Sequence, residues 1–544
     1  SPSEQLVDFD TQIIPILTRQ GCNRGACHGS AAGRGGFRLS LYGGDPAADF
    51  RAITWELGGR RIHRADADRS LLLRKPTEDL EHGGGYVLDA DSEAAELIRR
   101  WIAQGARRLQ RRRLERVEFS PAHLRVERSG EPITLRATAY YDDGSSEDVT
   151  RWTAWTTVDD TAVRLDLERH TVQVERPGRH LVLARFLNVV TPLEIILPYG
   201  RSTSRNPSIG GTASAKGQAV QRHPIDRLVE ERLAELGLEP SRVVDDYGFL
   251  RRVSLDLTGR LPSVDEVVAF AGDLDRDKRT AWIDRMLDSE EFATFWTYRL
   301  ATWWRVRAPG RGHSRDVIAA RTFQQWIHEN LERRTGLDAM ARQLITAEGD
   351  SHVHGAATFF RLANGPRELA EVFSETMMGV RLRCANCHNH PLDQWTQDDY
   401  HGLAALFAGV QAGRVVRDRG HGEVIHPRTS LPAVPRIPGE AAPVTGGRQQ
   451  LASWLTAPEN PYFARAMVNR VWAALLGKGL VEPVDDMRRT NPAVNERLLQ
   501  WLSEAWKDHG YDLRWLVRTI VTSDTYQRRW DPKATVVEQR MGAS

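Results

Sequence analysis

The chain has 544 residues, of which 41% are hydrophobic and 27% are charged, so it has a globular composition and the length of more than one domain. Its 74 Lys and Arg residues nearly balance 72 Asp and Glu residues, and a formal net charge of +2 gives no indication of a nucleic-acid partner. No apolar run has the length of a transmembrane helix, so we expect no transmembrane segment. Because the sequence begins at Ser1 without methionine, we expect that a leader peptide has been removed.

Residues 1–110 are predicted to form a small helical domain. The stretch GCNRGACHGS contains Cys22 and Cys27, five positions apart, and His28 follows the second cysteine at once. The segment DSEAAELIRRWIAQGA, residues 91–106, has the apolar spacing of an amphipathic helix and a glycine near its end. We expect this helix to close the domain.

Residues 117–200 have a different pattern. The stretch VEFSPAHLRVERSGEPITLRATAYYDDGSSEDVT alternates apolar and polar residues, with turn signals such as Asp143-Gly144. Strands at this spacing predict an inserted immunoglobulin-like β-sandwich of roughly 80 residues. Residues 201–221, rich in Gly, Ser and Thr, are the predicted linker to the next domain.

From residue 222 onward the pattern is helical. Residues 222–410 are expected to form a helical domain that holds a second cysteine motif, and residues 411–544 a C-terminal helical domain packed on it. Segments such as VIAARTFQQWIHENLERR and NERLLQWLSEAWKDHG have the helical period. Residues 411–447, rich in Pro, Gly and Arg, are expected to be irregular.

All four cysteines of the chain lie in two similar motifs, CNRGACH near the N terminus and CANCH in the helical region. Cys-x-x-Cys-His is the attachment signature of c-type haem, in which the thiols bond to the porphyrin and the histidine becomes a ligand of the iron. We therefore expect two covalently bound haem c groups, each with iron. The expected cofactor-binding residues are Cys22, Cys27, His28, Cys384, Cys387 and His388, with both histidines as metal ligands.

Three other interpretations of these motifs stay open. A zinc site also uses a Cys-x-x-Cys pair with histidine. A disulfide within each motif would suit a secreted chain. A thioredoxin-type redox motif needs a βαβ context, which the sequence does not show.

The second ligand of the N-terminal iron is expected to be a nitrogen atom. No methionine precedes Met286, and the available nitrogen ligands are His63, Lys75 and His82. Three glycines follow His82, and a backbone without side chains approaches a flat macrocycle closely. We therefore expect His82 to be the metal ligand opposite His28. For the second haem, the sequence selects no such residue.

Polar and aromatic side chains cluster directly after the second motif, in HPLDQWTQDDYHG. We expect His390 and Tyr400 to lie beside the second haem as candidate catalytic residues. In the alternative interpretation, Trp395 and Tyr400 belong to the core and the acidic residues cap helices, which is the common role of Asp at such places.

The chain resembles the large secreted cytochrome-c-type proteins that are abundant in planctomycetes. The resemblance rests on long motifs, among them CNRGACHG, SLLLRKPTEDLEHGGG, LRRVSLDLTGRLPSVDEVVAF, GVRLRCANCHNHPLDQW and NPYFARAMVNRVWAALLGKGLVEPVDDMRRTNP. It implies a cytochrome c domain, an immunoglobulin-like domain of bacterial group 2 and two long uncharacterised helical domains in series. It implies no particular reaction, but it suggests a polysaccharide context.

The expected fold is multidomain and mainly α, with a cytochrome c-like domain, a large helical domain and the inserted β-sandwich. The expected function is that of a secreted dihaem oxidoreductase, in the periplasm or at the cell surface. Its N-terminal haem would exchange electrons with a redox partner protein, and its central haem would be the catalytic one, with a polysaccharide as candidate substrate. The alternatives are a pure electron carrier and a glycan-binding protein with structural haems.

Overall fold

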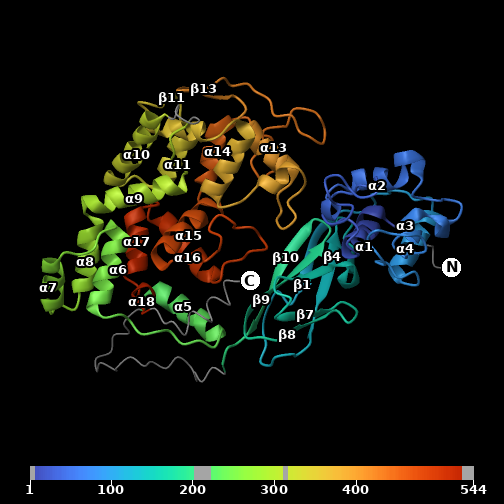
Figure 1. The fold of residues 1–544 in the computed structure, drawn as a ribbon, viewed down its shortest axis with the longest axis horizontal. Coiled ribbons are helices and arrows are strands. Elements are labelled where there is room, and N and C mark those ends of the chain that lie inside the picture. The colour runs from blue at the N-terminus through green and yellow to red at the C-terminus, as the bar shows by residue number, and fades with distance from the viewer. Residues whose placement is uncertain (1–5, 201–221, 310–315, 530–544) are drawn as a thin grey trace. The chain divides into compact units, whose positions relative to one another are not determined.

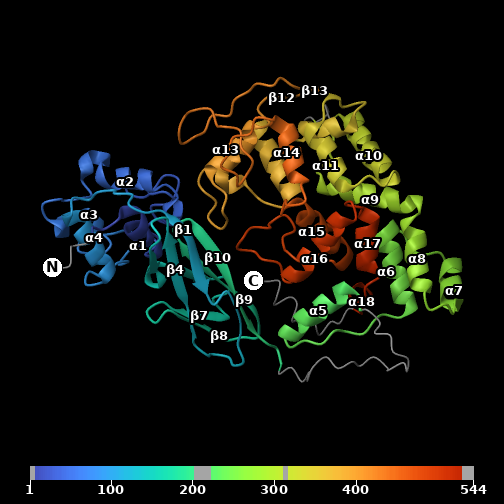
Figure 2. The same ribbon diagram turned by 180° about the vertical axis from the view of Figure 1, so that it is seen from behind.

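The structure, a computed structural model, describes residues 6–200, 222–309 and 316–529. The chain divides into two compact units (Figures 1 and 2). The first unit runs to Tyr199 and includes the short segment His388–Gln394, and the second contains the other described residues. The prediction of a multidomain chain, with β-sheets in the N-terminal part and helices elsewhere, is confirmed at this level. The linker expected at residues 201–221 lies outside the described residues.

The first unit begins with short helices. A π-helix, η1 (Phe9–Ile13), leads into α1 (Ile14–Arg19), and α2 (Pro46–Thr54), α3 (Leu71–Arg74) and α4 (Glu93–Ala103) follow. The helix expected at residues 91–106 is α4. It begins after Ser92, whose side chain accepts a hydrogen bond from the backbone N–H of Ala95, as an N-cap does. Its apolar face is buried, and Trp101 packs on Phe9 with ring centroids 5.2 Å apart.

The β-region of the first unit consists of ten strands in three sheets. The first sheet has the order β1-β4-β5, the second β2-β10-β9-β6 and the third β3-β8-β7. All strand pairs are antiparallel except β2 with β10. The strands are β1 (Leu114–Ser120), β2 (His123–Arg125), β3 (Ile133–Thr134), β4 (Arg136–Tyr141), β5 (Ser146–Asp148), β6 (Ala154–Thr157), β7 (Val163–Asp166), β8 (Thr171–Val174), β9 (Gly178–Phe186) and β10 (Val189–Leu197).

The predicted alternation of buried and exposed side chains is present in these strands. Along β9 the side chains are buried at every second position up to Ala184. The turn predicted at Asp143-Gly144 joins β4 to β5, where Gly144 has a φ of +79° and donates its N–H to the carbonyl of Tyr141 at 3.0 Å.

The second unit is helical, as predicted. Its helices are α5 (Pro224–Glu235), α6 (Asp246–Thr258), α7 (Val264–Gly272), α8 (Lys278–Leu287), α9 (Glu290–Trp303), α10 (Val317–Glu332), α11 (Leu337–Thr346), α12 (Pro366–Phe373), α13 (Gln397–Ala405), α14 (Gly447–Leu455), α15 (Phe463–Leu476), α16 (Glu496–Asp508), α17 (Leu513–Val521) and α18 (Asp524–Gln527). A π-helix, η8 (Ser374–Met378), precedes the second cysteine motif. A 3-10 helix, η9 (Arg383–Asn386), contains the first cysteine of the motif, Cys384. Among the described residues, no helix combines the length and the apolar character that crossing a membrane requires.

One part of the second unit differs from the expectation. The segment 411–447, expected to be irregular, contributes to a small antiparallel sheet of β11 (Gly349–Asp350), β13 (Val415–Asp418) and β12 (Val410–Ala412). Strands this short leave no recognisable alternation in a sequence, so the pairing was not predictable from the pattern.

Candidate functional site

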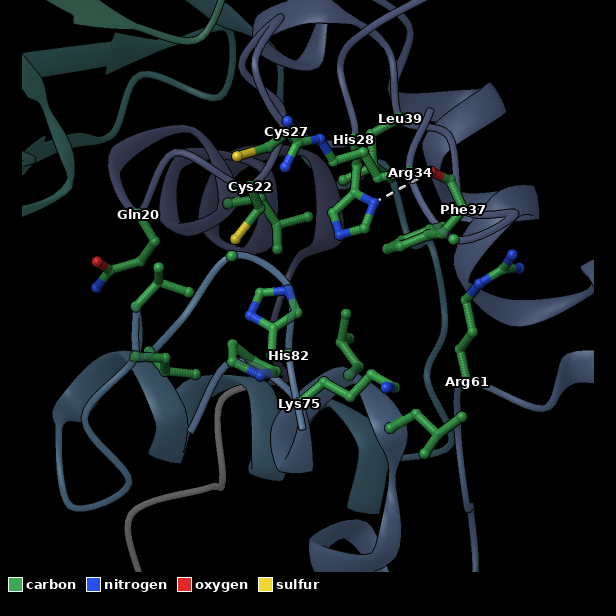
Figure 3. A pocket seen from close by; sticks show the side chains of 18 of the residues that line it. Gln20, Cys22, Cys27, His28, Arg34, Phe37, Leu39, Arg61, Lys75 and His82 are labelled. Carbon is green, nitrogen blue, oxygen red and sulfur yellow. Dashed lines mark hydrogen bonds between the residues drawn. The ribbon is translucent and has the colours of Figure 1, made fainter. Parts of the chain in front are cut away.

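A cavity of about 510 Å³ lies within the helical part of the first unit (Figure 3). Its apolar walls come from α1, α3 and α4, which contribute Leu17, Leu72 and Ile98, and from the loop that contains Phe37 and Leu39. All the residues that line the cavity lie between Ile16 and Ile98, so the second cysteine motif takes no part in it.

The first cysteine motif forms one wall of this cavity. After α1 the chain folds back on itself, and the N–H of His28 donates to the carbonyl of Cys22 at 3.0 Å. This tight loop places Cys22, Cys27 and His28 on the same cavity. A Cβ atom at Gly29 would lie 2.1 Å from the carbonyl oxygen of Asn23, so the loop requires glycine there. Both cysteines are free thiols, and burial together with the nearby Cys27 raises the pKa of Cys22 to about 11.

The imidazole rings of His28 and His82 face each other across the cavity, with the two thiols on one flank (Figure 3). Their centroids are 6.2 Å apart and their planes differ by 22°. The Nδ1 atom of His28 lies 3.1 Å from the carbonyl oxygen of Phe37, and that of His82 lies 2.9 Å from the carbonyl oxygen of Gly85. Since a carbonyl oxygen only accepts, the Nδ1 atom of each ring is the donor in its hydrogen bond.

Burial lowers the pKa of His28, although the hydrogen bond to Phe37 opposes the shift. The neutral imidazole is therefore the main form of His28 near pH 7. The cavity thus presents the neutral imidazole of His28, with the centroid of the His82 ring 6.2 Å away.

The glycines after His82 fit the shape of the site. Gly83 and Gly84 line the cavity, and a Cβ atom at Gly84 would lie 2.9 Å from Cε1 of His82. The absence of a side chain at Gly84 therefore leaves space for the imidazole ring of His82. The sequence suggested a close approach of these glycines to a flat macrocycle, whereas the close neighbour of Gly84 in the structure is this ring.

The charged side chains that line the cavity are all basic among the described residues: Arg34, Arg60, Arg61 and Lys75. Arg61 is held in place, since its guanidinium donates to the carbonyl oxygens of Ala52 and Gly36 at 2.5 and 2.7 Å and lies 4.4 Å from the centre of the Phe37 ring. Lys75, one of the nitrogen ligands considered above, donates instead to the carbonyl oxygen of Glu81 at 2.8 Å. Arg61 also pairs with Glu56 Oε2 at 3.5 Å. The other basic groups that line the cavity, Arg34, Arg60 and Lys75, favour a ligand with an anionic edge.

The sequence did not indicate Phe37, Leu39 or Arg61 as parts of this site. They lie in or after a glycine-rich loop, and their approach to His28 results from tertiary packing. An aromatic residue directly after the RGG of this loop was the one local signal available.

The second cysteine motif has a different environment. Cys384 and Cys387 are free and exposed, and both belong to the second unit. His388, the next residue, is counted with the first unit, and its Nδ1 lies 2.9 Å from the carbonyl oxygen of Asn389. The division between the two units therefore falls within the motif.

The two candidate catalytic residues are also counted with different units. His390 belongs to the first, where its Nδ1 accepts from the backbone N–H of Leu392 at 3.2 Å. Tyr400 belongs to the second; it is fully buried on α13, and its hydroxyl donates to Glu371 Oε1 at 2.8 Å. Burial and the Glu371 carboxylate raise the pKa of Tyr400, so its proton is firmly held. The catalytic role of these two residues stays a prediction.

The residues around Tyr400 have the arrangement of the alternative interpretation, in which the aromatic residues belong to the core and acidic residues cap helices. Trp395 is 1% exposed and belongs to the core. Thr396 and Asp399 form a capping box at the start of α13, in which the side chain of each accepts from the backbone N–H of the other. Asp398 pairs with Arg428 at 2.8 Å.

The prediction of two covalently bound haem c groups is wrong, because the structure shows no group of three or more His, Cys, Asp or Glu side chains that could hold a metal ion among the described residues. The cavity of the first unit brings together two imidazoles, and the thiols of the second motif are exposed. We therefore assign no iron to His28, His82 or His388.

Two family models match the chain. Residues 224–412 match the family described as PSCyt2, protein of unknown function (DUF1549), and residues 447–541 match PSD1, protein of unknown function (DUF1553). Both domains are typical of planctomycete-type proteins, which confirms that part of the resemblance, and no match to a cytochrome c or immunoglobulin-like model accompanies them. No curated protein matches the chain.

Proposed function

We propose that this chain is a redox protein of the cell exterior or periplasm, an oxidoreductase or an electron carrier, and that the cavity of the first unit is its ligand-binding centre. One observation supports this most strongly. The rings of His28 and His82 face each other at 6.2 Å across an apolar cavity whose wall contains the thiols of Cys22 and Cys27.

The features of the cavity select a class of ligand. Its apolar walls favour a largely apolar molecule. The basic residues Arg34, Arg60 and Lys75 favour a ligand with an anionic edge. Organic cofactors with an apolar body and an anionic edge supply redox chemistry that side chains lack, while the protein supplies binding and orientation.

The proposal includes the organisation of the first unit. Its helical part would be the cytochrome-c-type domain that opens the planctomycete proteins, and its strands would be the immunoglobulin-like domain that follows. The short helices closed by α4 support the first assignment, and antiparallel sheets around the buried Trp152 and Trp155 support the second.

The test compares the exported full-length chain by native and denaturing mass spectrometry. The native mass should exceed the sequence mass by that of the retained ligand, and His28→Ala and His82→Ala should each lower the retained fraction about tenfold, which is the effect of losing about 1.4 kcal/mol of binding. His123→Ala is the matched control, because this histidine is 53% exposed on β2 of the same unit and lies outside the cavity.

A redox measurement then separates a redox protein from a simple carrier of an apolar molecule. The ligand-loaded chain should exchange electrons reversibly with a soluble mediator. His28→Ala and His82→Ala should reduce the number of electrons exchanged in proportion to the ligand that each variant loses. An exported chain that retains no ligand would contradict the proposal, as would a ligand retained equally by all variants. The polysaccharide substrate and the redox partner protein stay predictions.

A further inference from the structure

The thiols of Cys384 and Cys387 lie on one tight turn of the second unit. Cys384 is part of the 3-10 helix η9, and the N–H of Cys387 donates to the carbonyl oxygen of Cys384 at 3.4 Å. A hydrogen bond between residues three apart closes a turn whose end Cα atoms lie within about 7 Å of each other. Disulfides span Cα separations of about 4.4–6.8 Å, so the turn holds the two cysteines within or close to bonding range.

The turn is anchored from the inner side. His401, fully buried on α13, approaches the carbonyl oxygen of Asn386 with its Nε2 at 3.1 Å, and the side-chain amide of Gln397 donates to the same oxygen at 3.3 Å. Ala385, between the two cysteines, is fully buried. The middle of the turn is therefore fixed to the core, whereas both thiols remain exposed to solvent.

The chain offers a contrast in its other pair of cysteines. Cys22 lies in the wall of the cavity, and its burial disfavours the thiolate that attacks a disulfide. Cys384 and Cys387 are exposed, so a partner molecule can reach both sulfur atoms. Exposure, turn geometry and anchoring together distinguish Cys384 and Cys387 from Cys22 and Cys27, which are only partly exposed.

We propose that Cys384 and Cys387 form a thiol–disulfide exchange site whose partner is a disulfide-bonded molecule. One cysteine attacks as thiolate, the S–S bond of the partner breaks, a mixed disulfide forms, and one partner thiolate leaves and is protonated. The second cysteine, also as thiolate, attacks the chain sulfur of the mixed disulfide, which forms the Cys384–Cys387 bond and releases the second partner thiol. The chain loses two electrons and two protons, and the partner disulfide gains both.

This inference does not rest on the function proposed for the cavity, and its test uses glutathione as the partner. The full-length chain is equilibrated with mixtures of reduced and oxidised glutathione, quenched with acid, alkylated with N-ethylmaleimide and digested. The peptide with Cys384 and Cys387 should change from doubly alkylated to internally disulfide-bonded as oxidised glutathione increases. A peptide that stays doubly alkylated, that binds two glutathiones, or that has another covalent group on either sulfur would overturn the proposal.

Single variants test the second exchange step. In Cys384→Ser and in Cys387→Ser, the remaining cysteine lacks its resolving partner, so the glutathione mixed disulfide should accumulate at least about tenfold over the unmodified chain. Glutathione that leaves the single variants as fast as the unmodified chain would contradict the proposal. If a variant fails to fold, the peptide analysis of the unmodified chain still decides the question.

Discussion

The position of the His82 side chain depends on Gly84, which has no side chain that could displace the ring. A Cβ atom at Gly84 would lie 2.9 Å from the ring of His82, whereas one at Gly83 would meet nothing within 4 Å. The ring is the far end of a movable side chain, so Gly84→Ala should shift the imidazole at little cost to the fold. We expect ligand retention to fall several-fold, with the free energy of unfolding changed by less than about 1 kcal/mol.

Gly25→Ala is the control for this prediction, because Gly25 is not among the residues that line the cavity and an added Cβ atom would meet only Leu41, at 3.8 Å. Ligand retention follows from native mass spectrometry, and stability from denaturant unfolding. If both variants lose the ligand equally, the position of the His82 ring is not the cause.

Asp49 makes the free energy of unfolding of the first unit depend on pH. This residue is 1% exposed on α2, and its carboxylate accepts from the hydroxyl of Ser40 at 2.7 Å. Burial nevertheless raises the pKa of Asp49 to about 6, against about 3.9 in an unfolded chain. Between about pH 4 and pH 6 the folded state therefore binds more protons than the unfolded state, and this carboxyl lowers the free energy of unfolding as the pH rises.

Asp49→Asn should remove that pH dependence. At pH 7 to 8 the neutral amide avoids a buried charge, and the stability of the first unit should rise by at most about 3 kcal/mol, the value of a two-unit pKa difference. At pH 4 the two proteins should differ little. Denaturant unfolding followed by tryptophan fluorescence at each pH measures this, and a variant that is less stable than the unmodified chain at pH 8 would show that the charged form is favoured.

Part of the site was predictable because its chemistry is local in the sequence. The spacing of Cys22, Cys27 and His28 and the glycines after His82 pointed to one site, and the structure places the three motif residues, His82 and the first two of the glycines around one cavity. The same motif at Cys384 predicted a second site of the same kind, yet its thiols are exposed. A motif specifies a chain geometry, whereas the walls of a cavity come from residues distant in sequence.

At the scale of elements, Asp226 joins the first and last described helices of the second unit. It lies on α5, is 6% exposed, and its carboxylate accepts from the backbone N–H groups of Asp524 and Thr525 at 3.0 and 2.7 Å and from the Thr525 hydroxyl at 2.6 Å. A carboxylate at a helix start satisfies free N–H groups there, and here it comes from almost 300 residues away in sequence.

Asp226→Ala should destabilise the second unit by about 3 kcal/mol, since buried N–H groups lose a charged acceptor. Amide exchange at Thr525 should become much faster, whereas helices distant from α5 keep their protection. Asp265→Ala, in the exposed first turn of α7, is the control and should change stability by less than about 1 kcal/mol. Equal effects of both substitutions would contradict the role of Asp226.

The helices of the second unit were predictable because their signals are short-range. Apolar periodicity and caps such as Ser289 before α9 or the glycine after α6 mark helix bodies and ends within a few residues. The pairing of β11 with β13 joins residues more than 60 positions apart through two-residue and four-residue strands. Such contacts depend on the tertiary packing of the whole unit, so no local sequence pattern predicts them.

At the scale of the molecule, the chain has two separate hydrophobic cores. One contains buried residues from Val7 to Leu197, and the other contains buried residues from Ile225 to Tyr526. Neither cluster includes a buried side chain of the other among the described residues. Each core therefore has the components of an independently folding domain.

Fragments of residues 6–199 and 222–529 should consequently each unfold in one cooperative transition when they are produced separately. The intact chain should show two transitions in differential scanning calorimetry, because all the buried residues of each hydrophobic core lie within one fragment. Asp226→Ala should lower only the transition of the longer fragment, and Asp49→Asn should change only that of the shorter one. A fragment without cooperative unfolding, or a substitution that shifts both transitions equally, would show that the two cores fold as one.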